Sequence, residues 1–173
     1  MRLAAASLYA HAPRTVVVPL NLFGLTPELT ALGQRWRVKD EFHVTAVSAR
    51  WLAERLRRDP AAVWESVVAA VQGRRAGTVR LGRELRLAAE GAERTLIVMA
   101  RVDGLRALYD ELSARLGEPL APPPAHITLY TRPDGEAIGL HDGDELRALT
   151  RPLDDEESAA VLAAAGLQAL LDG

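Results

Sequence analysis

The sequence has no cysteine and only one lysine, and both shortages narrow the range of functions. Without Cys among its 173 residues, the chain cannot form disulfides, thiolate zinc sites or cysteine nucleophiles. Lys39 is the only Lys, so the 21 basic residues are almost all Arg, whose guanidinium group suits bidentate contacts to phosphate. The formal net charge of -2 argues against a protein that binds nucleic acid mainly through a strongly basic surface.

Long apolar runs are also missing. No stretch approaches the ~18 consecutive apolar residues of a membrane span. Residues 1–14 contain a short, weakly apolar run that His11 and Pro13 interrupt, whereas a secretory signal has a stronger apolar segment. We therefore expect a cytoplasmic protein with no membrane partner. With 49% hydrophobic residues, residues 1–173 can form a single compact domain with a sizeable core.

Several motifs of metal and nucleotide chemistry are absent from the sequence. There is no His-Glu-x-x-His and no His-x-His, and the acidic stretch at residues 142–145 lacks the ligand spacing of an EF-hand loop. Neither a Gly-x-Ser-x-Gly nucleophile elbow nor a P-loop is found. We therefore predict a protein that uses no metal and no cofactor.

Hydrophobic periodicity and turn residues predict a mixed α+β fold. Runs rich in β-branched and apolar residues predict strands at residues 15–20, 42–48, 85–90, 95–102 and 125–131, with a shorter strand at 137–140. Apolar residues at helical spacing, preceded by capping residues, predict helices that begin at Thr26, Ser48, Asp59, Asp103 and the acidic residues 154–157. The last of these helices continues through the Ala-rich tail to residue 171.

The two halves of the chain share a weak internal repeat. Each half is expected to run strand, helix, strand, and the last strand of each carries the pattern His-x-Thr. This order predicts two similar βα lobes with antiparallel sheets, at about residues 15–73 and 78–140, followed by a helical tail. No loop marks a boundary between independent domains, so we expect the lobes to form one unit.

The His-x-Thr strands are "FHVTAVS" at residues 42–48 and "AHITLYT" at residues 125–131. Side chains alternate along a strand, so one face of each strand is mostly apolar and the other carries His and Thr. The polar faces are predicted to present His43, Thr45 and Val47 in the first strand and His126, Thr128 and Tyr130 in the second. In a dry core, each unpaired imidazole or hydroxyl would cost roughly 1–3 kcal/mol, whereas a water-filled groove between the lobes avoids that cost.

Two histidines on facing strands suit the cleavage of a phosphoester. Imidazole titrates near neutral pH, so a neutral His can accept a proton while a protonated His donates one. A Thr hydroxyl about 7 Å further along each strand can donate to a non-bridging phosphate oxygen. The alternative is purely structural: two partly buried histidines on edge strands, with their hydrogen bonds satisfied.

The two motifs, "FHVTAV" and "AHITLY", resemble those of the 2H phosphoesterase superfamily, over roughly residues 15–140. The resemblance implies two lobes around a central groove lined by His43, Thr45, His126 and Thr128. It also implies a metal-independent phosphodiesterase acting on a 2′,3′-cyclic phosphate or another nucleotide- or RNA-derived substrate. His43 would be the proton donor and His126 the acceptor.

The sequence departs from that family in two places. Where bacterial RNA enzymes of the family often have an Arg, two residues after the second His-x-Thr-Leu, this chain has Thr131, and Arg132 follows it. The segment at residues 133–149 has no counterpart that we can match. Both departures concern the substrate more than the chemistry.

Three further residues are candidates for substrate binding. Tyr130 could stack on a base or bind phosphate, or simply stand at the rim, and Arg132 could clamp phosphate or be a solvated loop residue. Trp36 lies between two arginines and could contact a nucleic acid, or could be half-buried with charges around it. His11 and His141 have no Thr two residues on, and His141 is read as a loop residue beside a turn.

Two other classes of function remain open beside the enzyme. The alternative is a non-catalytic module that captures a nucleotide or RNA in the same groove. A third hypothesis is an interaction protein that uses its Arg-rich helices as a contact surface. The expected partner is a nucleotide or an RNA end, and the sequence makes no prediction of oligomeric state.

Overall fold

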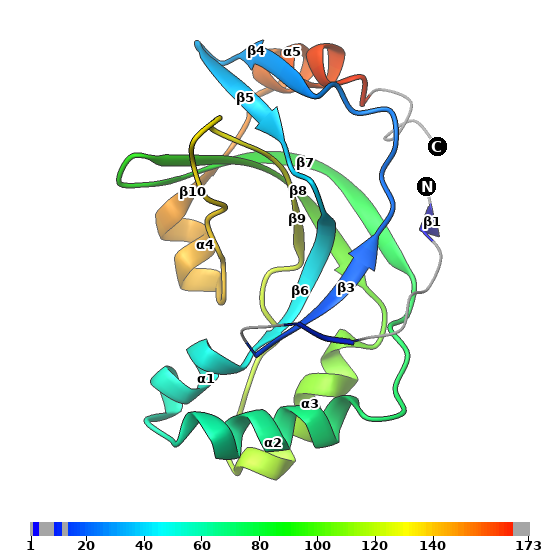
Figure 1. The fold of residues 1–173 in the computed structure, drawn as a ribbon, viewed down its shortest axis with the longest axis vertical. Coiled ribbons are helices and arrows are strands. Elements are labelled where there is room, and N and C mark those ends of the chain that lie inside the picture. Colours follow the sequence, from blue (N-terminus) through cyan, green and yellow to red (C-terminus); the bar gives the residue numbers. More distant parts are fainter. Residues whose placement is uncertain (1, 4–8, 12–13, 168–173) are drawn as a thin grey trace.

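Two antiparallel sheets and the helices that pack against them form an α+β fold, in a computed structural model that describes residues 2–3, 9–11 and 14–167 (Figure 1). The large sheet has the strand order β1 (Arg2–Leu3), β7 (Val79–Glu90), β8 (Glu93–Val102), β9 (His126–Thr131), β5 (Gln34–Val38) and β4 (Glu28–Ala31), with β10 (Thr150–Pro152) also paired to β7. The small sheet has the order β2 (Tyr9–His11), β3 (Thr15–Leu20) and β6 (Phe42–Ser48). The predicted α+β class is confirmed, while the arrangement as two similar lobes stays a prediction.

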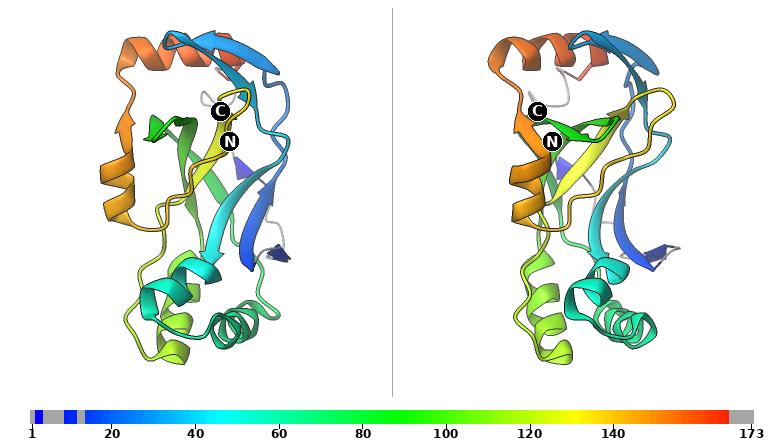
Figure 2. Two further views of the ribbon diagram at one scale, coloured as in Figure 1. Left: turned by 60° about the vertical axis from the view of Figure 1, so that its left-hand side comes forward. Right: turned by 90° about the vertical axis from the view of Figure 1, so that its left-hand side faces the viewer.

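Four of the five helices in the described part of the chain lie at the two ends of the sheets. The first three, α1 (Ala49–Leu56), α2 (Pro60–Val71) and α3 (Leu105–Leu116), pack together at one end (Figures 1 and 2). At the opposite end α5 (Asp155–Ala165) packs on β4, whereas α4 (Gly143–Leu149) lies part-way along the large sheet, beside β7 and β10 (Figure 2). This leaves the middle of β6 and β9 between the two groups of helices.

Capping residues explain where most of the helices begin. The side chain of Ser48 accepts from Trp51 N at α1, and that of Asp59 accepts from Ala62 N at α2, where Pro60 fills the first helical position. A capping box between Asp154 and Glu157 starts α5. These three starts were predicted from the sequence. The tail helix was expected to reach residue 171, of which residues 168–171 lie outside the described part.

The predicted Asp103 cap of α3 is wrong. The N-cap is Gly104 in the left-handed region with no side-chain cap, and Asp103 instead pairs with Arg80 across the sheet edge, at 3.0 Å. The sequence also missed α4, whose N-cap Asp142 accepts from the backbone of Asp144 and Glu145. Asp103 is engaged by its ion pair with Arg80, whereas Asp142 caps α4 through one carboxylate oxygen and pairs with Arg55 through the other, at 3.2 Å.

The predicted helix from Thr26 to Gly33 is also wrong. This segment forms the β4–β5 hairpin, whose two-residue turn is made by Leu32 and Gly33, both at positive φ. In β4 the burial alternates, with Leu29 and Ala31 inside and their neighbours exposed. The apolar spacing suited both a helix and a strand, and the pairing with β5 decided for the strand. The expected order of strand, helix, strand therefore fails in the first half of the chain.

The predicted short strand at residues 137–140 is absent, and this segment is irregular. Its apolar side chains Ile138 and Leu140 are nevertheless buried, in a small cluster with Ala88 and Ile97. The apolar pattern there reflects packing on the face of the large sheet rather than strand pairing. The β7–β8 hairpin was predicted, but β7 begins at Val79, earlier than expected.

Both His-x-Thr strands contain a one-residue register shift directly after their Thr. In β6, Thr45 lies opposite Val17 and Val47 lies opposite Val16, so Ala46 has no partner in β3. In β9, Thr128 lies opposite Ile97 and Tyr130 lies opposite Leu96, so Leu129 has no partner in β8. Such bulges re-aim the side chains that follow them and often occur beside active sites. The two motifs thus share a backbone feature that their spacing alone did not reveal.

The two halves of the chain meet along β9. Strand β5 of the first half pairs with β9 of the second, and Lys39 N donates to Leu129 O at 3.0 Å where β5 ends. The chain then leaves the large sheet and becomes β6 of the small sheet. The first half therefore contributes to both sheets, and β6 begins right beside β9.

Candidate functional site

The site begins with the position of β6 beside β9, which are in contact. The last backbone bond between the two segments is Lys39 N to Leu129 O; His43 follows Lys39 by four residues and His126 precedes Leu129 by three, so both histidines lie a similar distance beyond this bond in the same direction. Electrostatics agree with this placement, because positive charge on His43 lowers the pKa of His126. The fold thus brings the two predicted histidines close together.

Both His–Thr pairs lie on faces turned away from the main core. On β6 and β9 the main core takes up the alternate residues, including Val44, Ala46, Ile127 and Leu129. The cross-strand partners of Thr45 and Thr128 are Val17 and Ile97, and neither belongs to that core. Residues opposite each other in a ladder share a face. Thr45 and Thr128 are therefore placed, as predicted, beside the histidines of their own strands, and both are half-buried.

His126 is held in one orientation and one tautomer. Its side chain is only 8% exposed, and its Nδ1 lies 2.8 Å from the carbonyl oxygen of Pro124. A carbonyl oxygen can only accept, so Nδ1 carries the proton and Nε2 keeps a lone pair in the neutral ring. Burial lowers the pKa of His126 below 6.5, although the bond to Pro124 opposes that shift. His126 is therefore neutral near pH 7, with a lone pair on Nε2 that can accept a proton.

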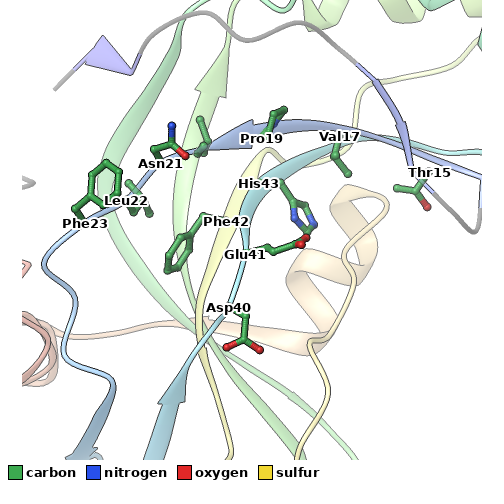
Figure 3. A pocket seen from close by; sticks show the side chains of 11 residues that line it. Thr15, Val17, Pro19, Asn21, Leu22, Phe23, Asp40, Glu41, Phe42 and His43 are labelled. Atoms are coloured by element: carbon green, nitrogen blue, oxygen red, sulfur yellow. The ribbon is translucent and has the colours of Figure 1, made fainter.

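His43 is the more accessible of the two histidines and borders a pocket of about 520 Å³. The pocket extends from His43 over β3, and Figure 3 shows Phe23, Phe42, Asp40 and Glu41 around it. Phe23 is 80% exposed and presents an apolar ring at the edge of this pocket. His126 does not line this pocket, so the pocket adjoins the site on the side of His43 alone.

The predicted face of Tyr130 is wrong. The bulge at Leu129 turns Tyr130 into the main core, where it is fully buried and its hydroxyl donates to Thr26 O at 3.0 Å. Burial raises the pKa of Tyr130 to about 12. Thr131, opposite Thr95, takes the face that Tyr130 was expected to share with His126. Tyr130 is a core residue and cannot contact a substrate.

Trp36 is also a core residue, contrary to its proposed role in binding nucleic acid. It is 0% exposed, lies opposite Leu29 in the β4–β5 hairpin and donates from Nε1 to Ala31 O at 2.9 Å. The neighbours Arg35 and Arg37 are exposed because strand alternation turns them outward. The structural alternative, a buried Trp with charged neighbours, fits better, since the fully buried indole cannot stack on a nucleic-acid base.

Arg132 lies away from the two histidines. It is exposed just after β9 and donates to the carbonyl oxygen of Ala92 at 2.8 Å, at the turn of the β7–β8 hairpin. Six residues of extended chain separate it from His126, about 20 Å along the strand. The structure therefore does not bring Arg132 to the site, and the solvated-loop interpretation fits its position.

His141 lies near His126, which sequence reasoning missed. Positive charge on His141 lowers the pKa of His126 and does so more strongly than charge on His43. The ring of His141 stacks on Trp51 of α1, with 5.6 Å between centroids and 8° between planes. Its Nδ1 lies 3.0 Å from Glu145 Oε2. The lack of a following Thr had made His141 look unremarkable, and its closeness to Glu145 in sequence was the one available signal.

Other kinds of site find little support in the described part of the chain. Within residues 2–3, 9–11 and 14–167, no group of three or more His, Asp or Glu side chains is placed to hold a metal ion. Across the same residues, no helix is both long and apolar enough to span a membrane. Comparisons with known protein families, curated proteins and solved structures found no match to this chain.

Proposed function

We propose that the protein is a phosphodiesterase of the 2H type, which cleaves a 2′,3′-cyclic phosphate or another nucleotide- or RNA-derived phosphodiester by paired-histidine catalysis without a metal. The observation that carries the proposal is the histidine pair on adjacent strands, in which His126 is held as a neutral base and His43 borders a pocket. The matching bulges after Thr45 and Thr128 support it, because they place both motifs in similar backbone surroundings.

In the proposed reaction a water molecule attacks the phosphorus atom. Nε2 of His126 accepts a proton from that water while a new P–O bond forms. Protonated His43 gives its proton to the sugar oxygen as the P–O bond to the sugar breaks. The hydroxyls of Thr45 and Thr128 donate to the non-bridging oxygens, where negative charge grows in the transition state. After one turnover the two histidines have exchanged protonation states, and proton exchange with solvent restores them.

The pocket beside His43 supports a substrate with a nucleoside part. Its volume of about 520 Å³ is within the ~300–1,000 Å³ of typical small-molecule sites. The pocket lining contains aromatic and aliphatic side chains with the carboxylates of Asp40 and Glu41, and its described residues include no Lys or Arg. A neutral base and sugar suit this lining better than additional phosphate groups do. The burial of Trp36 and Tyr130 removes two aromatic residues that were candidates for contact with a base.

A turnover screen tests the proposal. It would compare 2′,3′-cyclic mononucleotides, RNA with a 2′,3′-cyclic end and ADP-ribose cyclic phosphate, each with wild-type protein, the His43→Ala variant and wild-type protein in EDTA. We expect turnover of at least one substrate, unchanged by EDTA and lost in the variant. Tight binding of several substrates with no turnover of any would contradict the proposal and favour the non-catalytic binding module.

A further inference from the structure

The segment that covers the large sheet next to His126 carries a third histidine. Buried Leu140 packs in a cluster with Ile97 and the partly buried Met99. These two residues are the cross-strand partners of Thr128 and His126. The residue after Leu140 is His141, so packing of this segment sets His141 at the margin of the predicted catalytic face. The two His-x-Thr motifs do not include this segment, so the proposed mechanism gives it no role.

Trp51 and Glu145 hold His141 in place. Trp51 stacks on one face of its ring, and Arg55 lies over Trp51 at 5.1 Å and pairs with Asp142 at 3.2 Å. Glu145 Oε2 accepts from the backbone N of His141, at 2.6 Å, and lies 3.0 Å from its Nδ1. Because α1 follows directly on β6, these contacts tie His141 to the strand of His43 as well as to that of His126.

A glycine lies next to the edge of the imidazole that carries Cε1 and Nε2. A Cβ added at Gly139 would lie 3.1 Å from Cε1 and 3.4 Å from Nε2 of His141, closer than most real contacts. Gly139 does not have the positive φ that would require glycine for the backbone. The glycine therefore gives the imidazole room for its present position, with Nδ1 turned to Glu145 and Nε2 on the side near Gly139.

We propose that His141 is a third substrate-contacting residue, whose Nε2 binds the phosphate that His43 and His126 act on. When both ring nitrogens are protonated, Nδ1–H donates to the Glu145 carboxylate and Nε2–H donates to a phosphate oxygen, so the imidazolium has an anion at each nitrogen. The inference rests on the proposed phosphodiesterase activity for its substrate, but the contact itself requires only an anion. The stacked and hydrogen-bonded ring is pre-organised, which reduces the entropy lost when the anion binds.

Kinetics and phosphate binding together test this role. The His141→Gln variant would be compared with wild-type protein for kcat and KM on the substrate found in the screen, and for the Kd of inorganic phosphate by NMR titration. We expect KM and the phosphate Kd to rise roughly 10- to 100-fold, the range of a charge-assisted hydrogen bond, while kcat changes less than about 3-fold. The matched control is Arg147→Gln, which removes an exposed cation from the neighbouring helix α4 and should change neither constant.

A second variant keeps the test sharp if His141→Gln folds poorly. Gly139→Ala retains His141 but pushes on its imidazole, so we expect a smaller increase in both KM and phosphate Kd with an unchanged melting temperature. Unchanged KM and phosphate Kd in both variants, while His43→Gln abolishes turnover, would overturn the inference and leave the proposed function standing. No turnover by wild-type protein, with weaker phosphate binding by His141→Gln, would overturn the proposed function and uphold the anion contact.

Discussion

The strands β6 and β9 carry the same His-x-Thr pattern and the same bulge, yet they hold their histidines differently. His126 is buried near the start of a central strand of the large sheet, and the carbonyl oxygen of Pro124 fixes its tautomer. His43 belongs to the small sheet and borders a pocket. Acid–base catalysis by two like residues requires that one be neutral while the other is protonated. The difference in surroundings between the two strands is one way to separate those roles.

The largest expected effect comes from replacing each histidine in turn. We expect His126→Gln and His43→Gln each to lower kcat/KM by about 10²–10⁴, the usual contribution of a positioned general acid or base. Circular dichroism should show that both variants stay folded. Their pH–rate profiles sharpen the comparison, because loss of the base should remove the acidic limb and loss of the acid the basic limb. Wild-type activity in either variant would exclude the paired mechanism.

The threonines should have smaller effects, of similar size in the two strands. Thr45→Val and Thr128→Val each remove one hydroxyl donor from a half-buried position and keep the shape of the side chain. We expect each to lower kcat/KM roughly 10- to 100-fold, about 1.4–2.7 kcal/mol of transition-state stabilisation. A large loss in one variant and none in the other would show that the two motifs are not functional equivalents, despite their matching bulges.

Tyr130 tests the consequence of the bulge in β9. Tyr130→Phe leaves the carbonyl oxygen of Thr26 without the donor that Tyr130 supplies, so we expect unfolding to become easier by about 1–2 kcal/mol. Denaturant unfolding would measure this change. Turnover at a temperature where both proteins are folded should stay within about twofold of wild type, because the hydroxyl lies in the core. A tenfold rise in KM would restore Tyr130 to the substrate site.

The smallest effect concerns the protonation of His126. NMR titration of its ring should give a pKa below 6.5, and nitrogen shifts at pH 7 should report a neutral ring with the proton on Nδ1. Because the folded pKa is lower than the unfolded one, the unfolded state binds more protons between the two values. Stability should therefore fall as the pH drops through this range, and less so in His126→Gln. The opposite slope, or a ring with the proton on Nε2, would contradict the assignment of His126 as the base.

The elements that the sequence predicted correctly are those set by interactions between residues close together in the chain. Ser48 and Asp59 were predicted as helix starts because a cap acts within three residues. The helix expected after Thr26 failed because its apolar spacing also suits a hairpin, and the burial of Trp36 opposite Leu29 settled the choice. Local signals were sufficient where the structure is local, and misleading where a partner strand decided the conformation.

In the candidate site, too, the predictions from local pattern held and those that depended on distant contacts failed. Alternation along each strand correctly placed His43 with Thr45 and His126 with Thr128, because no bulge lies within either pair. The same alternation gave the wrong face for Tyr130. The bulge at Leu129 adds one residue and so reverses the alternation after Thr128, and this bulge exists only in the pairing with β8. His141 was missed because its contacts with Trp51 and the neighbourhood of His126 bring together distant parts of the chain.

The sequence by itself determined the candidate site residues, the strands that carry them and the α+β class, since these follow from residue type and from the two-residue period of a strand. Only the tertiary structure decided which aromatic residues are buried, which histidine is held in one tautomer with a lowered pKa, and which third histidine lies near it. The physical reason is that burial, carbonyl partners and charge at short range are properties of the packed molecule. An imidazole has the same intrinsic chemistry at positions 43, 126 and 141, and its surroundings assign the role.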